Sequence, residues 1–182
     1  ARGFSGQLQL PGDKSISHRL VLASLLIDGS LEIGNPADGE DVQTSLQIVE
    51  QLGVEIKKSQ DRLLLSSSGS RPGGTHELYC GNSGTTTRLL AAILAGRPGH
   101  YRLTGDASLS RRPMRRIVEP LRLMGADIVC ENSDNLPIVI NGQQELLPLI
   151  FENPLGSAQV KSAVLLAGMH ARGETRVHEA DR

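Results

Sequence analysis

The sequence of 182 residues has little aromatic content and no strong charge of either sign. It has no tryptophan, two tyrosines and two phenylalanines, which argues against a surface that stacks nucleobases or an interface built on aromatic anchors. Its 19 lysines and arginines face 20 aspartates and glutamates, so no overall field draws the chain to nucleic acid or an anionic membrane. Anion binding would have to come from local clusters. This elimination favours small-molecule chemistry.

Cysteine and long apolar runs are also scarce. Cys80 and Cys130 stand far apart without metal-ligand spacing, and we interpret both as reduced structural thiols. No apolar run reaches the roughly 20 residues that span a bilayer, and no basic segment with a following apolar stretch opens the sequence. We therefore expect a soluble, cytoplasmic protein. Both ends enter or leave strand-like runs abruptly, which is typical of a fragment of a longer chain.

What the sequence does contain is an internal repeat. Three segments begin near Gly12, Gly81 and Gly156, at spacings of 69 (81 − 12) and 75 (156 − 81) residues. Each runs from a glycine-led turn with small polar residues, through an apolar helix, to a β-branched or apolar strand. Helices that are almost wholly apolar over two to three turns are expected to be buried helices rather than surface helices.

The second halves of the first two segments also match. In 42–56 and 114–128, apolar residues fall at helical spacing, and Gly53 and Gly125 stand where a C-cap glycine precedes a strand. The pattern predicts an α/β fold of repeated β-α-β-α-β-β units of roughly seventy residues, two complete and a third in part. The apolar helices should pack inside, with small sheets around them, in an inside-out arrangement.

The repeats open with glycine and small hydroxyl residues directly before a helix. Helix starts carry unpaired N–H groups and a partial positive charge, so such an entry can hold a phosphate or carboxylate. Residues 81–86 could equally be a turn with an N-cap. Cations beside these entries favour an anionic, phosphorylated ligand at Lys14 and Arg19, although solvated surface charges remain an alternative. That alternative is stronger for Arg88 and Lys161.

A fourth cluster lies in GDASLSRRPMRR, which begins at Gly105 and places four arginines within six positions just before a helix. Cations at a helix N-terminus oppose the helix dipole, so stability does not explain them, whereas an anionic ligand would. A solvated basic patch is the alternative. Asp106 could pair with one of these arginines and orient its guanidinium.

Searches for a nucleophile or metal motif are negative. The sequence has no GxSxG elbow, HExxH or Walker pattern, and its five scattered histidines are interpreted as structural or exposed. Asp13 could tune Lys14, or could serve an N-terminal turn.

Four motifs, in this order and at these separations, resemble those of the 5-enolpyruvylshikimate-3-phosphate synthases: PGDKSISHR, GNSGTTTRLL, GDASLSRRPM and GSAQVKSAVLLAG. The resemblance covers essentially the whole chain. It implies two globular domains, each of three β-α-β-α-β-β units, that close around the substrates. Residues 1–182 would form an incomplete N-terminal domain, with the C-terminal domain absent from this chain.

The resemblance also implies an activity. The family transfers the enolpyruvyl group of phosphoenolpyruvate to the 5-hydroxyl of shikimate 3-phosphate, in the pathway to chorismate and aromatic amino acids. Phosphate leaves through a tetrahedral intermediate, without a metal or organic cofactor. The implied partners are these two substrates and the C-terminal domain, with no nucleic acid and no membrane. The herbicide glyphosate occupies the phosphoenolpyruvate site, and Gly84 has no side chain to crowd it.

Site residues are carried over motif by motif. Lys14 would be catalytic and touch both substrates, because its ammonium can neutralise charge and, at a lowered pKa, exchange a proton. The shikimate 3-phosphate contacts would be Lys14, Ser15, Arg19, Ser157, Ala158 and Gln159. The phosphoenolpyruvate contacts would be Lys14, Asn82, Gly84, Thr85, Arg112 and Gln159.

Two departures from the family pattern bear on these expectations. The third motif has Ser-Ala-Gln where some members have Ser-Ser-Gln, which removes one hydroxyl contact and leaves the backbone to serve. The family's second domain supplies an acidic catalytic residue and further basic residues, so this chain alone should bind weakly and not turn over.

Two alternatives remain. A UDP-N-acetylglucosamine enolpyruvyl transferase shares the fold and the donor, but its catalytic loop normally carries a cysteine, and neither Cys80 nor Cys130 lies in such a loop. A non-catalytic anion-binding or assembly module would keep the fold without turnover, although such a relic need not retain Lys14, Arg19, Arg112 and Gln159 together.

Overall fold

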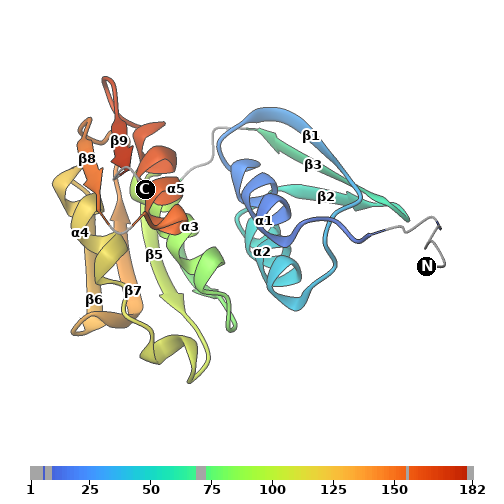
Figure 1. Cartoon of the computed structure of the whole chain (residues 1–182), viewed down its shortest axis with the longest axis horizontal. Coiled ribbons are helices and arrows are strands. Elements are labelled where there is room, and N and C mark those ends of the chain that lie inside the picture. The colour runs from blue at the N-terminus through green and yellow to red at the C-terminus, as the bar shows by residue number, and fades with distance from the viewer. Residues whose placement is uncertain (1–5, 7–9, 69–72, 155, 180–182) are drawn as a thin grey trace, which may run out of the picture.

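The computed structural model describes residue 6 and residues 10–68, 73–154 and 156–179 (Figure 1). The first repeat contributes α1 (Lys14–Ala23), β1 (Asp28–Gly34), α2 (Glu40–Gln51), β2 (Glu55–Lys58) and β3 (Arg62–Ser68). The second contributes β4 (Thr75–Tyr79), α3 (Gly84–Ala95), β5 (Gly99–Thr104), the 3-10 turn η1 (Leu109–Arg111), α4 (Arg115–Leu123), β6 (Asp127–Asn132) and β7 (Asn135–Gly142). The third contributes β8 (Ile150–Asn153), α5 (Ala158–Gly168) and β9 (Arg176–Glu179).

The α/β class is confirmed. The second repeat has the expected β-α-β-α-β-β order, apart from η1, and the third has its first strand, helix and second strand. The strand expected at the start of the first repeat falls on residues 1–10, of which only Gly6 and Leu10 are described.

Each repeat builds its own small sheet. The first sheet is antiparallel in the order β1-β3-β2, and the second is mixed in the order β4-β5-β7-β6, with β4 parallel to β5. Strands β8 and β9 form a parallel pair. In Figure 1 the first sheet lies with α1 and α2 on one side of the molecule, and the other sheets lie on the far side of α3 and α5.

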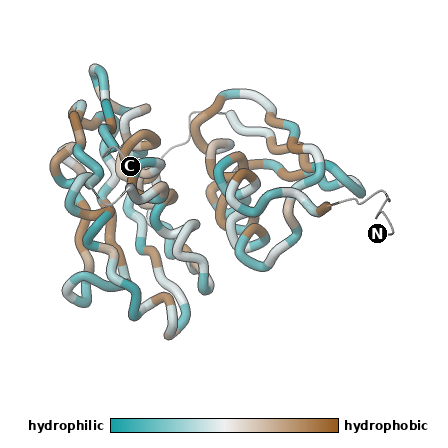
Figure 2. The backbone as a smooth tube through the Cα atoms, in the orientation of Figure 1, coloured by the Kyte–Doolittle hydropathy of each residue, from teal (hydrophilic) through white to brown (hydrophobic). Residues whose placement is uncertain are grey.

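Helix α3 is the centre of the fold. Ten of its twelve residues are buried, and it packs against α1, α2, α4 and α5, which explains why its sequence is apolar on every face. Hydrophobic stretches line the helices and strands, while most outer turns are hydrophilic (Figure 2).

The expected burial of the three apolar helices holds for α3 and is only partial for α1 and α5. Each buries four residues along one stripe, and apolar side chains such as Ile16, Leu165 and Met169 are 45–65% exposed. In both helices, apolar side chains also lie outside the stripe that the neighbouring described elements cover. The apolar sequence alone therefore did not predict which side chains are buried.

The glycines that open the repeats have two different physical reasons. Gly81 and Gly156 adopt left-handed backbone conformations, with φ of +56° and +57°, in the turns before α3 and α5. Gly12 is instead required by a close approach, because a Cβ there would lie 1.9 Å from the carbonyl oxygen of Asn35.

The second helices end as predicted. Gly53 and Gly125 have φ of +85° and +82° and follow the ends of α2 and α4, where a left-handed residue turns the chain into β2 and β6. Both cysteines are free, and burial raises the pKa of the Cys80 thiol to about 11. Among the described residues, no helix has both the length and the apolarity that crossing a membrane requires.

Candidate anion-binding site

The three helix starts are capped by their own side chains. Asp13 Oδ1 accepts from Ile16 N at 2.8 Å, Ser83 Oγ from Thr86 N at 3.2 Å and Ser157 Oγ from Val160 N at 3.4 Å. The alternative of an N-cap is therefore right for residues 81–86, and Asp13 serves its helix start. One cap satisfies one of the four donors that a helix start leaves unpaired, so capping is compatible with anion binding.

Arg19 joins the first helix to the last. Its Nη2 and Nε donate to Ser162 Oγ at 3.0 and 3.3 Å, while its Nη1 donates to the Ser15 carbonyl at 3.0 Å. This arginine therefore lies between α1 and α5, three positions along α5 from Gln159. Segments 143 residues apart in sequence meet at these contacts.

Gln159 joins α5 to α3. Its Nε2 donates to Thr85 Oγ1 at 3.0 Å, and its Oε1 accepts from Arg88 Nη1 at 2.9 Å. Arg88 Nη2 also donates to the Pro113 carbonyl at 3.4 Å, next to Arg112. The carboxamide is held at both ends, with a fixed orientation.

Arg112 is held by Asn82. Its Nη2 donates to Asn82 Oδ1 at 2.5 Å, and Asn82 Nδ2 donates to Asp106 Oδ2 at 2.6 Å. The pKa of Asp106 is lowered, first by the hydrogen bond from Leu109 N and then by the one from Asn82. The expected direct pairing of Asp106 with an arginine is replaced by this relay, because the Asn82 amide lies between the two charges.

Gly84 lies beneath two guanidinium groups. A Cβ there would lie 2.8 Å from Arg88 Nη1 and 3.3 Å from Arg112 Nη1. The missing side chain keeps the space that both arginines occupy at the start of α3.

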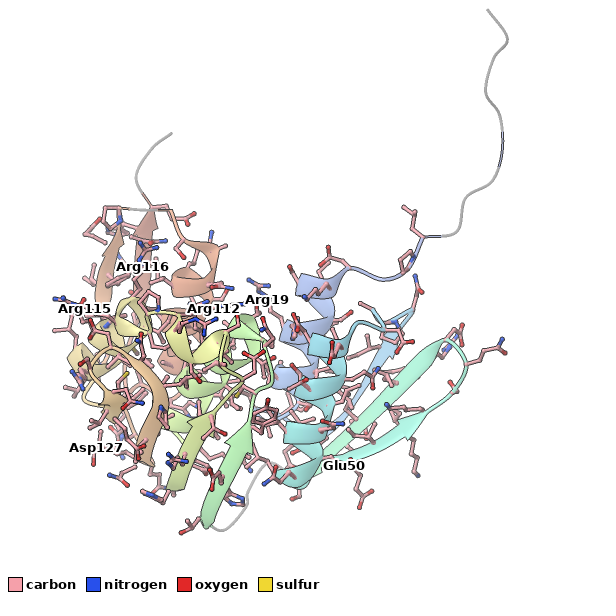
Figure 3. The ribbon with its side chains drawn as sticks, turned by 90° about the horizontal axis from the view of Figure 1, so that it is seen from below. Arg19, Glu50, Arg112, Arg115, Arg116 and Asp127 are labelled. Atoms are coloured by element: carbon pink, nitrogen blue, oxygen red, sulfur yellow. The ribbon has the colours of Figure 1, made fainter. Side chains whose placement is uncertain are left out.

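The charge at this edge of the molecule is largely uncompensated. Figure 3 shows Arg19, Arg112, Arg116 and Arg115 along one edge, with Asp127 and Glu50 toward the opposite one. Arg115 pairs with Glu119, but Arg88 and Arg116 form no ion pair within the described part of the chain. Burial, and then the charges of Arg112 and Arg116, lower the pKa of half-buried Arg88. An anion would relieve this repulsion.

Lys14 stands apart from these contacts. Its ammonium pairs with Asp41 of α2, and its side chain is 59% exposed. Ser15, the next residue in α1, is exposed, and so is Ala158 on α5. Lys161 pairs with Glu179 at 2.8 Å. The solvated alternative for Lys161 is therefore supported. The substrate-binding and catalytic roles of Lys14 and of the other site residues remain predictions.

Arg88 is the residue that the sequence interpretation undervalued. It stands seven residues after Gly81 (88 − 81), as Arg19 stands seven after Gly12 (19 − 12), so the repeat register was a usable signal. Its contacts bridge α3, α5 and the turn before α4. No group of three or more metal-ligating side chains with suitable geometry occurs among the described residues.

The sequence matches the family model for EPSP synthase (3-phosphoshikimate 1-carboxyvinyltransferase) over residues 2–182. The chain belongs to this family. A 3-phosphoshikimate 1-carboxyvinyltransferase of Xanthomonas campestris is 46% identical over 180 residues, which cover 97% of this chain and 41% of that protein. One of Streptococcus pyogenes is 42% identical over 181 residues, covering 98% of this chain and 42% of its own length.

Solved structures agree with this assignment. An EPSP synthase from Acinetobacter baumannii superposes with a TM-score of 0.88 at 40% identity, covering 97% of this chain and 41% of its own. The chain therefore spans about two fifths of the length of the relatives it matches.

Proposed function

We propose that residues 1–182 are an incomplete N-terminal domain of an EPSP synthase, and that they carry half of the site that joins phosphoenolpyruvate to shikimate 3-phosphate. The observation that carries the proposal is the Gln159 carboxamide, held by Thr85 and Arg88. It brings the α3 and α5 starts together beside Arg112 and gives one anionic ligand access to several fixed donors.

In this proposal each cluster has its own ligand. Arg19, Ser15, Ser157, Ala158 and Gln159 line the side toward α1 and α5 and take shikimate 3-phosphate. Arg112, Asn82, Gly84 and Thr85 lie at the start of α3 and take phosphoenolpyruvate, with Gln159 between the two. Holding two anions side by side costs repulsion, which the arginines offset.

Lys14 is proposed to act on both ligands. The 5-hydroxyl of shikimate 3-phosphate gives up its proton and adds to the enolpyruvyl carbon bearing the phosphate, while the neighbouring methylene carbon takes up a proton, giving a tetrahedral intermediate with a methyl group. Phosphate then leaves as that methyl group loses a proton and the double bond re-forms. A lysine near both groups can stabilise developing charge and move a proton. Its ammonium would have to exchange Asp41 for substrate.

Activity is proposed to need a C-terminal domain, which would supply an acidic group and further cations. This chain alone should bind shikimate 3-phosphate weakly and release no phosphate. The cytoplasmic location expected from the sequence belongs to the same proposal.

Calorimetric titration and a phosphate-release assay test it. Shikimate 3-phosphate should bind the chain measurably, while a UDP-sugar should not, and phosphate release should require a separately produced C-terminal domain from a relative. Appreciable release by the chain alone would refute the need for the second domain. Binding of the UDP-sugar instead would support the other enolpyruvyl transferase, and binding without turnover in the mixture would support a non-catalytic module.

A further inference from the structure

A buried chain of four polar side chains connects the starts of α1 and α3. His18 Nδ1 lies 2.9 Å from Ser45 Oγ, Ser45 Oγ lies 2.8 Å from Thr86 Oγ1, and Thr86 Oγ1 lies 2.7 Å from Ser83 Oγ. All four residues are at most 1% exposed. Three helices contribute to it, because Ser45 belongs to α2.

The single hydrogen on each hydroxyl fixes the direction of the chain. Thr86 donates to Ser83, so Thr86 must accept from Ser45, since two lone pairs would otherwise face each other at 2.8 Å. The Asp41 carbonyl is a longer alternative acceptor for Ser45, at 3.3 Å. Ser45 then accepts from His18, which is the neutral tautomer with its hydrogen on Nδ1.

The remaining ring nitrogen indicates that His18 is not there for packing. His18 Nε2 is buried and has no hydrogen-bond partner within the described residues. A buried polar atom without a partner costs stability, so an apolar side chain would serve packing better. Its hydrogen bond to Ser45 is what a leucine could not provide.

We infer that His18 is a positioning residue, which through Ser45, Thr86 and Ser83 sets the α1 start against the α3 start. His18 follows Lys14 by one helical turn and precedes Arg19, while Ser83 lies between Asn82 and Gly84. A shift at either end of the chain therefore moves residues proposed to bind one substrate relative to those proposed to bind the other. The inference rests on the proposed function.

Variants of His18 test it in the chain complemented by a C-terminal domain. His18→Leu should raise the KM for both substrates about tenfold, about 1.4 kcal/mol in binding terms, because the two helix starts lose their link. His18→Asn keeps an N–H near the position of Nδ1 and should stay within about twofold of the unaltered chain. Ser45→Ala should resemble His18→Leu, and serves if that variant does not fold.

A control separates positioning from stability. Ile138→Val in β7 makes a small cavity in the buried core and should lower the melting temperature without changing KM. Equal KM values for His18→Leu, Ser45→Ala and Ile138→Val would overturn the inference, as would failure of His18→Asn to restore binding. No turnover by the unaltered, complemented chain would overturn the proposed function, and this inference with it.

Discussion

The α3 start and the α1 start present their cations in different ways. At α3, Arg112 and Arg88 are fixed by neutral groups, the Asn82 amide, the Gln159 amide and a backbone carbonyl. At α1, Lys14 is exposed and bound to the carboxylate of Asp41. A guanidinium held by neutral acceptors keeps its full charge for a ligand, whereas a paired ammonium must first give up its partner. The cations at the α3 start are therefore already fixed in place, whereas the lysine at the α1 start must exchange its partner before it can meet an anion.

Loss of Arg112 should give the largest effect on this contrast. Arg112→Ala removes a fixed charge from the α3 start and should lower kcat/KM for phosphoenolpyruvate about a hundredfold or more in the complemented enzyme. The matched control is Arg115→Ala, since Arg115 lies on the same edge but pairs with Glu119. Steady-state kinetics with varied phosphoenolpyruvate measure both, and similar losses for the two variants would contradict a specific role for Arg112.

A methyl group at Gly84 should give a smaller effect. Gly84→Ala would push the far ends of Arg88 and Arg112 rather than the backbone, so the fold should survive while the KM for phosphoenolpyruvate rises about tenfold. Because family resemblance places glyphosate in the same space, its inhibition constant should also rise.

The control for Gly84 is Gly39→Ala, since a Cβ at Gly39 meets nothing within 4 Å. Inhibition curves with varied glyphosate measure the outcome. An inhibition constant unchanged by Gly84→Ala would remove the steric argument.

Freeing Lys14 tests the other side of the contrast. Asp41→Asn removes the carboxylate that competes with an anionic ligand, so shikimate 3-phosphate should bind the chain about two- to fivefold more tightly, the scale expected of an exposed pair. Glu40→Gln, on the same turn of α2, controls for net charge. Calorimetry of both variants decides, because equal gains would indicate a general charge effect.

The fold followed from the sequence where the signal was local or repeated. The repeat register predicted the order of elements, and Gly53 and Gly125 predicted two helix ends through backbone conformation. What local pattern could not supply was the partner of each polar side chain. From the sequence alone, Arg88 is interpreted as a solvated cation. In the structure it donates to Gln159, which lies 71 residues away in the sequence.

The same limit explains two other differences. Asp106 is close to Arg112 in sequence, yet an amide from a distant turn separates them. The exposed apolar side chains of α1 and α5 show the same limit, because the hydrophobicity of a helix does not indicate which element packs against it.

The smallest expected effect is on the pH dependence of the free energy of unfolding, through the buried His18 that links the two helix starts. Burial is the main cause of the lowered pKa of His18; Lys14 and Arg19 lower it further, and Asp41 of α2 raises it. The unfolded chain takes up a proton below the ordinary histidine pKa of about 6.5, while the folded chain resists it. The contribution of His18 to the free energy of unfolding should therefore be fully present above the ordinary histidine pKa. It should decline as the pH falls from that value toward the lowered pKa of His18 in the folded chain.

Urea denaturation between neutral and mildly acidic pH measures this decline. His18→Asn has no titrating ring and should show a shallower decline. Burial and Arg97 lower the pKa of His170 too, so part of the decline should persist in His18→Asn. An identical decline with and without His18 would mean that its imidazole does not resist protonation in the folded chain. The neutral state inferred for His18 in the folded chain would then be wrong.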